Sequence, residues 1–285
     1  MNNKIERPLI SVYMPTKNRS TLLKKAINSV LNQDYANVEL IIINDGSTDD
    51  TFSLLQDYQN RYENIHCFHN KTSTGVAQAR NQALKHCSGE FVTGLDDDDS
   101  FCPDRLSSLM SSYDDKYSFV CSSIVWDFGN KTKIADSHRK IINLTEQLNY
   151  NHATTQVLVK KERLDGIGGF DSNLVARIDY DAWTRLIEKY GCALRIAHPS
   201  YILNRGGDIE RVTSSNNDII GNHQFLAKHK HMMNSHNLIN HVFIDLYARN
   251  EPYAFKTFIS HLLAGYKLNK LKYYIRSNFL PRWHK

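Results

Sequence analysis

The sequence has no long apolar run, few cysteines and, toward its end, no acidic residue. Residues 1–7 are mostly polar, and no later stretch approaches the roughly 20 apolar residues that span a bilayer. We therefore expect a cytoplasmic protein without a secretory signal or a membrane-spanning helix. With 285 residues, 41% of them hydrophobic, the chain can form one large domain, alone or with an appended piece, and disorder is not expected.

Cysteine and histidine show no disulfide or metal signature. The five cysteines are an odd number without a CxxC pair, so we expect reduced thiols. Of the 13 histidines, His66 and His69 stand beside Cys67 in what reads as a strand, and the others are scattered. Without the spacing of metal ligands, this arrangement does not favour a histidine metal site.

No Asp or Glu follows Glu251, so the C-terminal segment is basic although the net charge is only +5. Within it, apolar residues recur at helical spacing, and residues 267–274 mix lysines with aromatic side chains. The apolar positions are Phe255, Phe258, Ile259, Leu262, Leu263 and Tyr266. This pattern is typical of a segment that lies on an anionic membrane surface without crossing it. The alternative is that the apolar stripe packs on the rest of the protein.

Strand and helix signals alternate over the first hundred residues. Residues 9–14, 38–44, 65–68 and 91–95 read as strands, because they are apolar or β-branched and end in polar residues. Between them, 22–31, 52–58 and 75–86 carry helical patterns, and 154–159 reads as a later strand. Alternating strands and helices predict a mainly parallel α/β sheet covered on both faces, with ligands bound beyond the carboxyl ends of the strands.

Acidic side chains follow two of these strands: Asp45 follows the second, and an unbroken run from Asp96 to Asp99 follows the fourth. Neighbouring carboxylates about 6 Å apart repel by roughly 3 kcal/mol at an effective dielectric of about 20, so positive charge must compensate. Carboxylates suit Mn²⁺ or Mg²⁺, which completes its shell with phosphate oxygens and water. The run therefore predicts a metal-diphosphate site. A solvated turn that caps a helix starting at Pro103 is the alternative.

Five segments in order resemble the inverting glycosyltransferases of family 2, which have the GT-A fold. They are 10–19, 39–49, 75–81 together with 95–99, 168–171 and 179–186, and the resemblance covers about residues 8–205. It implies a Rossmann-like nucleotide-binding sheet flanked by helices. The implied parts are a nucleotide-sugar-binding half at 1–125, an acceptor-binding half at 126–215 and a helical, basic and aromatic extension at 216–285.

The resemblance also assigns roles to residues. Asp45 would hold a uracil-type base, and Asp96 and Asp98 would form the metal-binding DxD pair, with Asp97 and Asp99 as second choices. The residues expected at the nucleotide sugar are Pro15, Thr16, Arg19, Asp45, Arg80, Asp96 and Asp97. The alternatives are a plain turn with a helix cap after Asp45 and a surface salt bridge at Arg80.

Sugar transfer with a metal-neutralised leaving group needs only one base, which takes the proton of the acceptor hydroxyl. Asp179 occupies the place of the family's catalytic Asp. The family usually has Glu or Gln before this residue, whereas this chain has Ile178, so Asp181 is the second candidate. A plain helix cap is the alternative role for Asp179.

We therefore expect a metal-dependent hexosyltransferase that uses a UDP-sugar, with UDP-glucose or UDP-galactose favoured. The tail favours a saccharide acceptor linked to undecaprenyl diphosphate, as in O-antigen or lipopolysaccharide assembly at the cytoplasmic face of the inner membrane, and nucleic acid is not an expected partner. Two other classes stay open. A nucleotidyltransferase would release diphosphate and carry a Gly-rich, Lys-bearing loop near its start, and a membrane-bound pseudo-transferase would bind nucleotide sugar without turnover.

Overall fold

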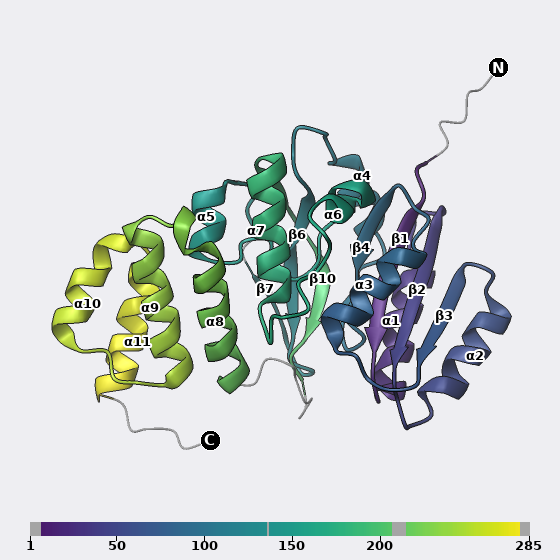
Figure 1. Ribbon diagram of the computed structural model, residues 1–285, viewed down its shortest axis with the longest axis horizontal. Helices are drawn as coiled ribbons and strands as arrows, with labels where there is room; N and C mark the ends of the chain where they lie inside the picture. The colour runs from purple at the N-terminus through teal and green to yellow at the C-terminus, as the bar shows by residue number, and fades with distance from the viewer. Residues whose placement is uncertain (1–6, 136, 207–214, 280–285) are drawn as a thin grey trace.

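The computed structural model describes residues 7–135, 137–206 and 215–279. Its first part alternates strands and helices as the sequence predicts (Figure 1). The elements are β1 (Ile10–Thr16), α1 (Ser20–Leu31), β2 (Val38–Asp45), α2 (Thr51–Arg61), β3 (Ile65–Asn70), α3 (Val76–His86) and β4 (Phe91–Gly94). The strand order is β3-β2-β1-β4 with all neighbours parallel, and the short β9 (Val159–Lys160) adds antiparallel to β4.

Both faces of this sheet are buried, which explains its continuous apolar runs. Val12 and Leu40 pack with α1 on one face, while Tyr13 and Ile41 pack with α3 on the other. The expected mainly parallel sheet with helices on both faces is therefore confirmed.

A second sheet follows, which the sequence pattern did not reveal. It contains β5 (Ser100–Phe101), β6 (Val120–Asp127), β7 (Thr132–Ala135), β8 (Lys140–Ile142) and β10 (Ala193–Asn204), with α4 (Arg105–Ser111) after β5. Its order is β5-β10-β6-β7, and β8 also pairs with β10. Only the β6–β10 pair is parallel.

The strand expected at 154–159 is formed only at its end, where Leu158 makes a β-bridge with Val120 and Val159 begins β9, and it is wrong for 154–157. Thr154 has a φ of +68°, and its carbonyl accepts from the side chain of Asn151. The Thr155 carbonyl accepts from the Trp183 indole, and the Gln156 carbonyl accepts from Arg105. Because side chains occupy these carbonyls, the segment cannot use them in a strand ladder.

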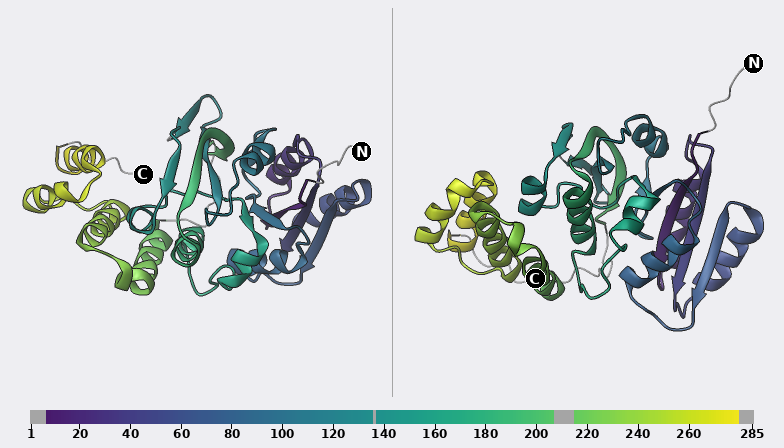
Figure 2. Two further views of the ribbon diagram at one scale, coloured as in Figure 1. Left: turned by 90° about the horizontal axis from the view of Figure 1, so that it is seen from above. Right: turned by 45° about the horizontal axis from the view of Figure 1, so that its top comes forward.

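Helices make up the rest of the described chain: α5 (Leu144–Asn149), α6 (Lys161–Gly166), α7 (Ile178–Tyr190), α8 (Ser215–His229), η1 (Lys230–Met232), α9 (Ser235–Arg249), α10 (Phe255–His261), η2 (Leu262–Ala264) and α11 (Lys267–Phe279). In Figures 1 and 2, α9–α11 lie at the end of the molecule opposite β1–β3, and α8 lies beside α7. Ring stacking joins α7 to α8, because Tyr180 and Phe225 are 4.0 Å apart between ring centroids. Among the described helices, none combines the length and the apolarity needed to cross a membrane.

Candidate functional site

The carboxyl ends of β1, β2 and β4 lie at one edge of the first sheet. Thr16 pairs with Asn44, next to Asp45, and Tyr13 pairs with Gly94, two residues before Asp96. This register brings the strand-end residues of the sequence prediction to the same edge, as expected for a parallel sheet.

Arg80 lies between two carboxylates that are distant in sequence. Its Nη2 donates to Asp96 Oδ1 at 2.6 Å, and its Nη1 donates to Asp179 Oδ1. The Arg80 side chain is 5% exposed, so this is not a surface salt bridge. The Phe170 ring centroid lies 5.3 Å from the guanidinium carbon, and Gln156 Nε2 lies 3.4 Å from Asp96 Oδ1. Arg80, Asp96 and Asp179 are thus brought together, and Gln156 and Phe170 join them without having been predicted.

Asp179, in the first turn of α7, has the environment of a base. Burial raises the pKa of its carboxyl to about 6, and repulsion by Asp96 acts in the same direction, while Arg80 opposes both. A carboxylate with this pKa is ionised at neutral pH and accepts a proton more readily than an ordinary Asp. Its side chain is 25% exposed, and it lies inside α7, whose N-cap position is Arg177, so the plain cap role finds no support.

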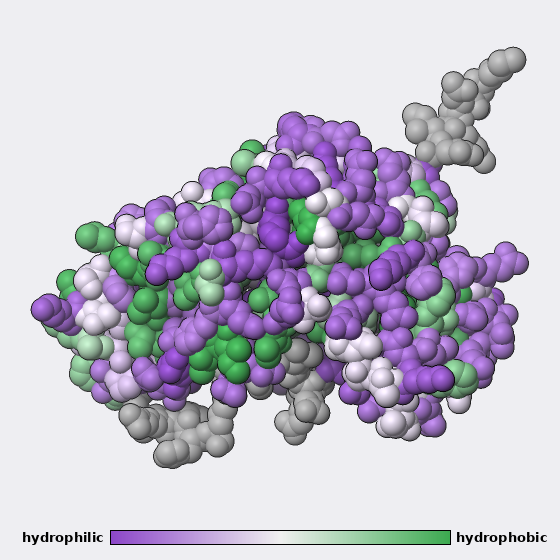
Figure 3. All heavy atoms as spheres, viewed as in Figure 1, coloured by the Kyte–Doolittle hydropathy of each residue, from purple (hydrophilic) through white to green (hydrophobic). Residues whose placement is uncertain are grey.

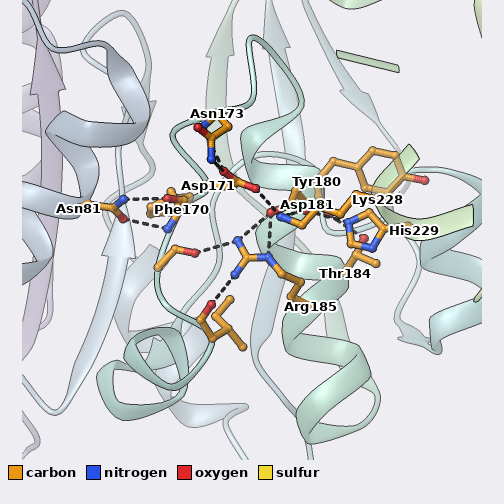
Figure 4. A network of polar contacts seen from close by, with 12 residues as sticks. Asn81, Phe170, Asp171, Asn173, Tyr180, Asp181, Thr184, Arg185, Lys228 and His229 are labelled. Carbon is orange, nitrogen blue, oxygen red and sulfur yellow. Dashed lines mark hydrogen bonds and ion pairs between the residues drawn. The ribbon is translucent and has the colours of Figure 1, made fainter. Parts of the chain in front are cut away.

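Asp181 has the opposite environment (Figure 4). Its side chain is fully buried and accepts from Arg185 Nε at 2.8 Å, Lys228 Nζ at 2.9 Å and His229 Nε2 at 2.8 Å. Burial opposes ionisation, but the bonds from His229, Arg185 and Lys228 hold the pKa of Asp181 at about 2. Because its oxygens are occupied by Arg185, Lys228 and His229, the geometry favours Asp179 over Asp181 as the base.

The four consecutive aspartates face different partners. Arg19 Nη1 lies 2.9 Å from both Asp97 Oδ1 and Asp98 Oδ2, which supplies positive charge to the run. Burial raises the pKa of Asp97 to about 6, against the effect of Arg19. Asp99 is buried toward the second sheet and accepts from the Tyr201 hydroxyl at 2.8 Å. The run is therefore an organised, partly buried cluster and not a solvated turn, and the helix after it starts at Arg105 instead of Pro103.

Asp96 and Asp98 keep 28% and 15% of their side chains exposed, which leaves room for a ligand. Within the described ranges, no group of three or more His, Cys, Asp and Glu side chains is arranged to hold a metal. A Mn²⁺ or Mg²⁺ that takes one or two carboxylates and completes its shell with diphosphate and water fits this donor set. Arg80 and Arg19 would then share these carboxylates with the metal.

Asp45 ends β2 and is 4% exposed. It accepts hydrogen bonds from the side chains of Asn70, Ser73 and Thr74 and from the backbone of Thr74 and Gly75. Burial opposes ionisation, but these bonds lower the pKa of Asp45 to about 2. The carboxylate therefore organises the loop before α3, and a nucleotide base would have to share one of its oxygens. Pro15 and Thr16, also expected here, are buried in β1.

Comparison with known proteins identifies the class. Residues 11–173 match the model of Glycosyl transferase family 2, and the chain belongs to this family. A protein of Escherichia coli K12, named as a proposed colanic acid biosynthesis glycosyl transferase, WcaA, is 32% identical over 90% of this chain and 93% of its own length. A Campylobacter jejuni protein, GalNAc(5)-diNAcBac-PP-undecaprenol beta-1,3-glucosyltransferase, is 41% identical over 44% of this chain and 41% of its length.

Solved structures show the same fold. Staphylococcus aureus TarS residues 1–349 in complex with UDP-GlcNAc align with a TM-score of 0.61 and 17% identity, over 94% of this chain and 90% of that one. The Pyrobaculum calidifontis mannosyltransferase PcManGT, in complex with GDP-Man and Mn²⁺, aligns with a TM-score of 0.57 and 18% identity, over 96% of this chain and 74% of that one. The family and the GT-A fold implied by the sequence motifs are thus confirmed.

Proposed function

We propose that the protein is an inverting, metal-dependent hexosyltransferase that moves a hexose from a UDP-sugar to a saccharide linked to a lipid diphosphate. The observation that best supports this proposal is that one buried arginine, Arg80, holds the strand-end Asp96 next to Asp179. In this proposal residues 1–125 bind the nucleotide sugar, 126–215 bind the acceptor and 216–285 reach the membrane.

Each side chain has a role in the proposed reaction. Asp179 takes the proton of the acceptor hydroxyl while that oxygen attacks the anomeric carbon from the face opposite the diphosphate. Arg80 keeps Asp179 in place and lies beside the diphosphate, where its planar donors suit phosphate oxygens. Asp96 and Asp98 would hold Mn²⁺ or Mg²⁺, which when bound neutralises charge on the leaving diphosphate.

The similar proteins support the choice of substrates. The TarS structure contains UDP-GlcNAc, and the name of the Campylobacter relative specifies a glucosyl group and an undecaprenol-linked acceptor. We therefore place UDP-glucose first among the donors, with UDP-galactose kept from the sequence expectation, and an undecaprenyl diphosphate saccharide of O-antigen or related polysaccharide assembly first among the acceptors. Because PcManGT was solved with GDP-Man, GDP-mannose belongs in the donor screen.

One assay tests this reaction against the other classes. The purified protein is incubated with Mn²⁺, a mixture of UDP-sugars and lipid-diphosphate saccharides, and UDP and diphosphate are measured separately. The proposal predicts acceptor-dependent release of UDP. Release of diphosphate would indicate a nucleotidyltransferase, and nucleotide-sugar binding without release would indicate a non-catalytic protein.

The proposal includes an anionic membrane surface at the cytoplasmic face as a third partner. The prediction that the apolar stripe and residues 267–274 contact the membrane is wrong in part, because Phe258, Tyr273 and Lys270 are buried in the C-terminal helices. Lys270 Nζ donates to Asn240 Oδ1 and to the His261 carbonyl, both at 2.8 Å, and burial lowers its pKa to about 8. These contacts fix α11 against α9 and α10.

Other side chains of α10, η2 and α11 remain exposed, and we call them the tail surface. Its apolar members are Phe255, Ile259, Leu263, Leu268, Leu271, Ile275 and Phe279, and its cations are Lys256, Lys267, Lys272 and Arg276. Arg282 and Lys285 also belong to the basic C-terminal segment, but they lie outside the described residues. Figure 3 shows apolar residues among polar ones over the end that these helices form. Exposed apolar and cationic side chains together support attachment to an anionic bilayer.

A further inference from the structure

An ionic cluster centred on the buried Asp181 lies between α7, α8 and the turn before α7 (Figure 4). We call Asp171, Asp181, Arg185, Lys228 and His229 the Asp181 cluster. Lys228 Nζ joins its two carboxylates, at 2.9 Å from Asp181 Oδ1 and 2.6 Å from Asp171 Oδ2. The cluster therefore ties α8 to α7 and to the turn that contains Asp171.

The same cluster holds the turn at 167–171. Arg185, fixed by Asp181, donates from Nη1 to the Ile167 carbonyl at 2.6 Å and from Nη2 to the Gly169 carbonyl at 2.8 Å. Asn81 of α3 holds the turn from the other side. Its Nδ2 donates to the Phe170 carbonyl at 2.7 Å, and its Oδ1 accepts from the Phe170 N–H at 2.8 Å.

Phe170 connects this turn to the reacting groups. Its buried ring lies under the Arg80 guanidinium, and its centroid is 5.9 Å from that of Trp183 and 5.8 Å from that of Tyr13. A cation over an aromatic face is attracted to it, so the position of the Phe170 ring helps to set that of Arg80. Arg80 in turn orients Asp179 and Asp96.

We propose that Asp181 is a positioning residue for sugar transfer: through Arg185 and Lys228 it fixes the 167–171 turn, and through Phe170 it fixes Arg80 between Asp96 and Asp179. The effect on sugar transfer rests on the proposed function, whereas the linkage from Asp181 to Arg80 rests on the contacts described above. Buried ionic groups contribute little net stability compared with well-packed apolar residues. Positioning of the 167–171 turn therefore explains the presence of the cluster better than stability does.

Two substitutions release the turn from opposite sides. Lys228→Met removes the contact from α8, and Asn81→Ala removes the contact from α3. The matched control is Asp218→Asn, which removes another ion pair between α8 and the start of α7, Asp218 with Arg177 at 3.0 Å, without touching the turn. Lys228→Arg is the conservative variant for rescue.

Kinetics separate positioning from stability when they are measured at a temperature at which all variants are folded. Lys228→Met and Asn81→Ala should each lower kcat by about 10- to 100-fold, the cost of a misplaced group, with the donor KM nearly unchanged. Asp218→Asn should keep the wild-type kcat, and Lys228→Arg should recover most of it. If both turn variants match Asp218→Asn in kcat and differ from wild type only in thermal midpoint, the cluster is merely structural and the proposal is overturned.

A second readout does not depend on activity. In a background with Trp126→Phe and Trp283→Phe, Trp183 is the remaining tryptophan and packs against Phe170. Its emission should shift in Lys228→Met and Asn81→Ala but not in Asp218→Asn. If the wild type releases no UDP, the proposed function fails, and the emission alone decides whether the cluster fixes Phe170. Unchanged emission in both turn variants would contradict the proposal.

Discussion

Two aspartates in the first turn of α7 differ in their neighbours although they are two positions apart. Asp179 points toward Arg80 and the strand-end acids, whereas Asp181 is enclosed by Arg185, Lys228 and His229. A motif that reads Asp-Tyr-Asp offers both residues as bases. Burial makes the pKa of Asp179 high, whereas the bonds and charges of His229, Arg185 and Lys228 hold the pKa of Asp181 low against its burial.

The first prediction concerns Asp179. Asp179→Asn should lower kcat by roughly 10²- to 10⁴-fold, the contribution of a positioned base, and leave UDP affinity close to that of the wild type. Single-turnover kinetics and UDP titration measure the two effects. Asp181→Asn should lower kcat less, by about 10- to 100-fold, because the 167–171 turn is released, and it should also lower the thermal midpoint, because Arg185, Lys228 and His229 lose their shared carboxylate. A normal kcat in Asp179→Asn would exclude it as the base.

The acid limb of the pH profile should report the same residue. Burial raises the pKa of Asp179 to about 6, above the ordinary value of about 3.9. Because the base must be unprotonated, kcat/KM should be constant above this pH and fall about tenfold per pH unit below it. Asp97 has a raised pKa as well, about 6, so the profile should be repeated with Asp97→Asn. An acid limb that disappears in Asp97→Asn would assign it to Asp97 instead.

Metal dependence is tested at Asp98. Chelation with EDTA should abolish UDP release, and added Mn²⁺ or Mg²⁺ should restore it. Asp98→Asn removes the charge with little change in volume, so folding should persist while the metal concentration needed for half-maximal rate rises. Circular dichroism provides the folding control. Full activity after exhaustive chelation would rule out this role of the metal.

At the scale of the elements, the parallel half of the fold was predictable and the second sheet was not. In β1 and β2 the apolar runs, turn residues and helical patterns agree, because each βα unit forms from neighbouring residues. The second sheet depends on pairings such as β5 with β10, which join residues about a hundred positions apart. Long separation in sequence also hid Gln156 and Phe170, since nothing local indicates that they meet Asp96 and Arg80.

The turn after β2 also depends on a distant loop, and Gly46 is where the two meet. Gly46 has a φ of +72°, and a Cβ there would lie 2.6 Å from the backbone nitrogen of Ser73. Gly46→Ala should cost about 1–2 kcal/mol for the left-handed backbone and more for the close contact. It should also weaken UDP binding, because it displaces the loop that Asp45 holds.

Urea denaturation and UDP titration measure these effects. The control is Gly129→Ala, because Gly129 has a φ of +84° but no atom lies within 4 Å of its Cβ position. Equal losses in both variants would show that the loop contact is unimportant.

At the scale of the whole molecule, the two ends differ in the charge of their side chains. The acidic strand-end cluster lies at the first sheet, whereas the described residues after Glu251 carry cations and no acid. The tail surface therefore presents four described cations beside seven exposed apolar side chains. A lipid-linked acceptor is held in a bilayer, so attachment through this end would keep the enzyme at the surface that carries its acceptor without inserting a helix.

The last prediction is that the tail surface binds anionic vesicles reversibly. Each Lys or Arg near an anionic bilayer contributes about 1 kcal/mol, so the cations give a few kcal/mol, to which buried apolar side chains add. The full chain should sediment with phosphatidylglycerol vesicles at low salt and largely dissociate at high salt, where the charges are screened. Replacing Leu268, Leu271 and Ile275 by Ser should abolish sedimentation. Replacing Phe52, Ile134 and Val175, which are comparably exposed elsewhere, should not. If the two triple variants sediment equally, or the wild type fails to bind at low salt, these helices do not attach the enzyme to the membrane, and the proposed lipid-linked acceptor loses its physical support from this chain.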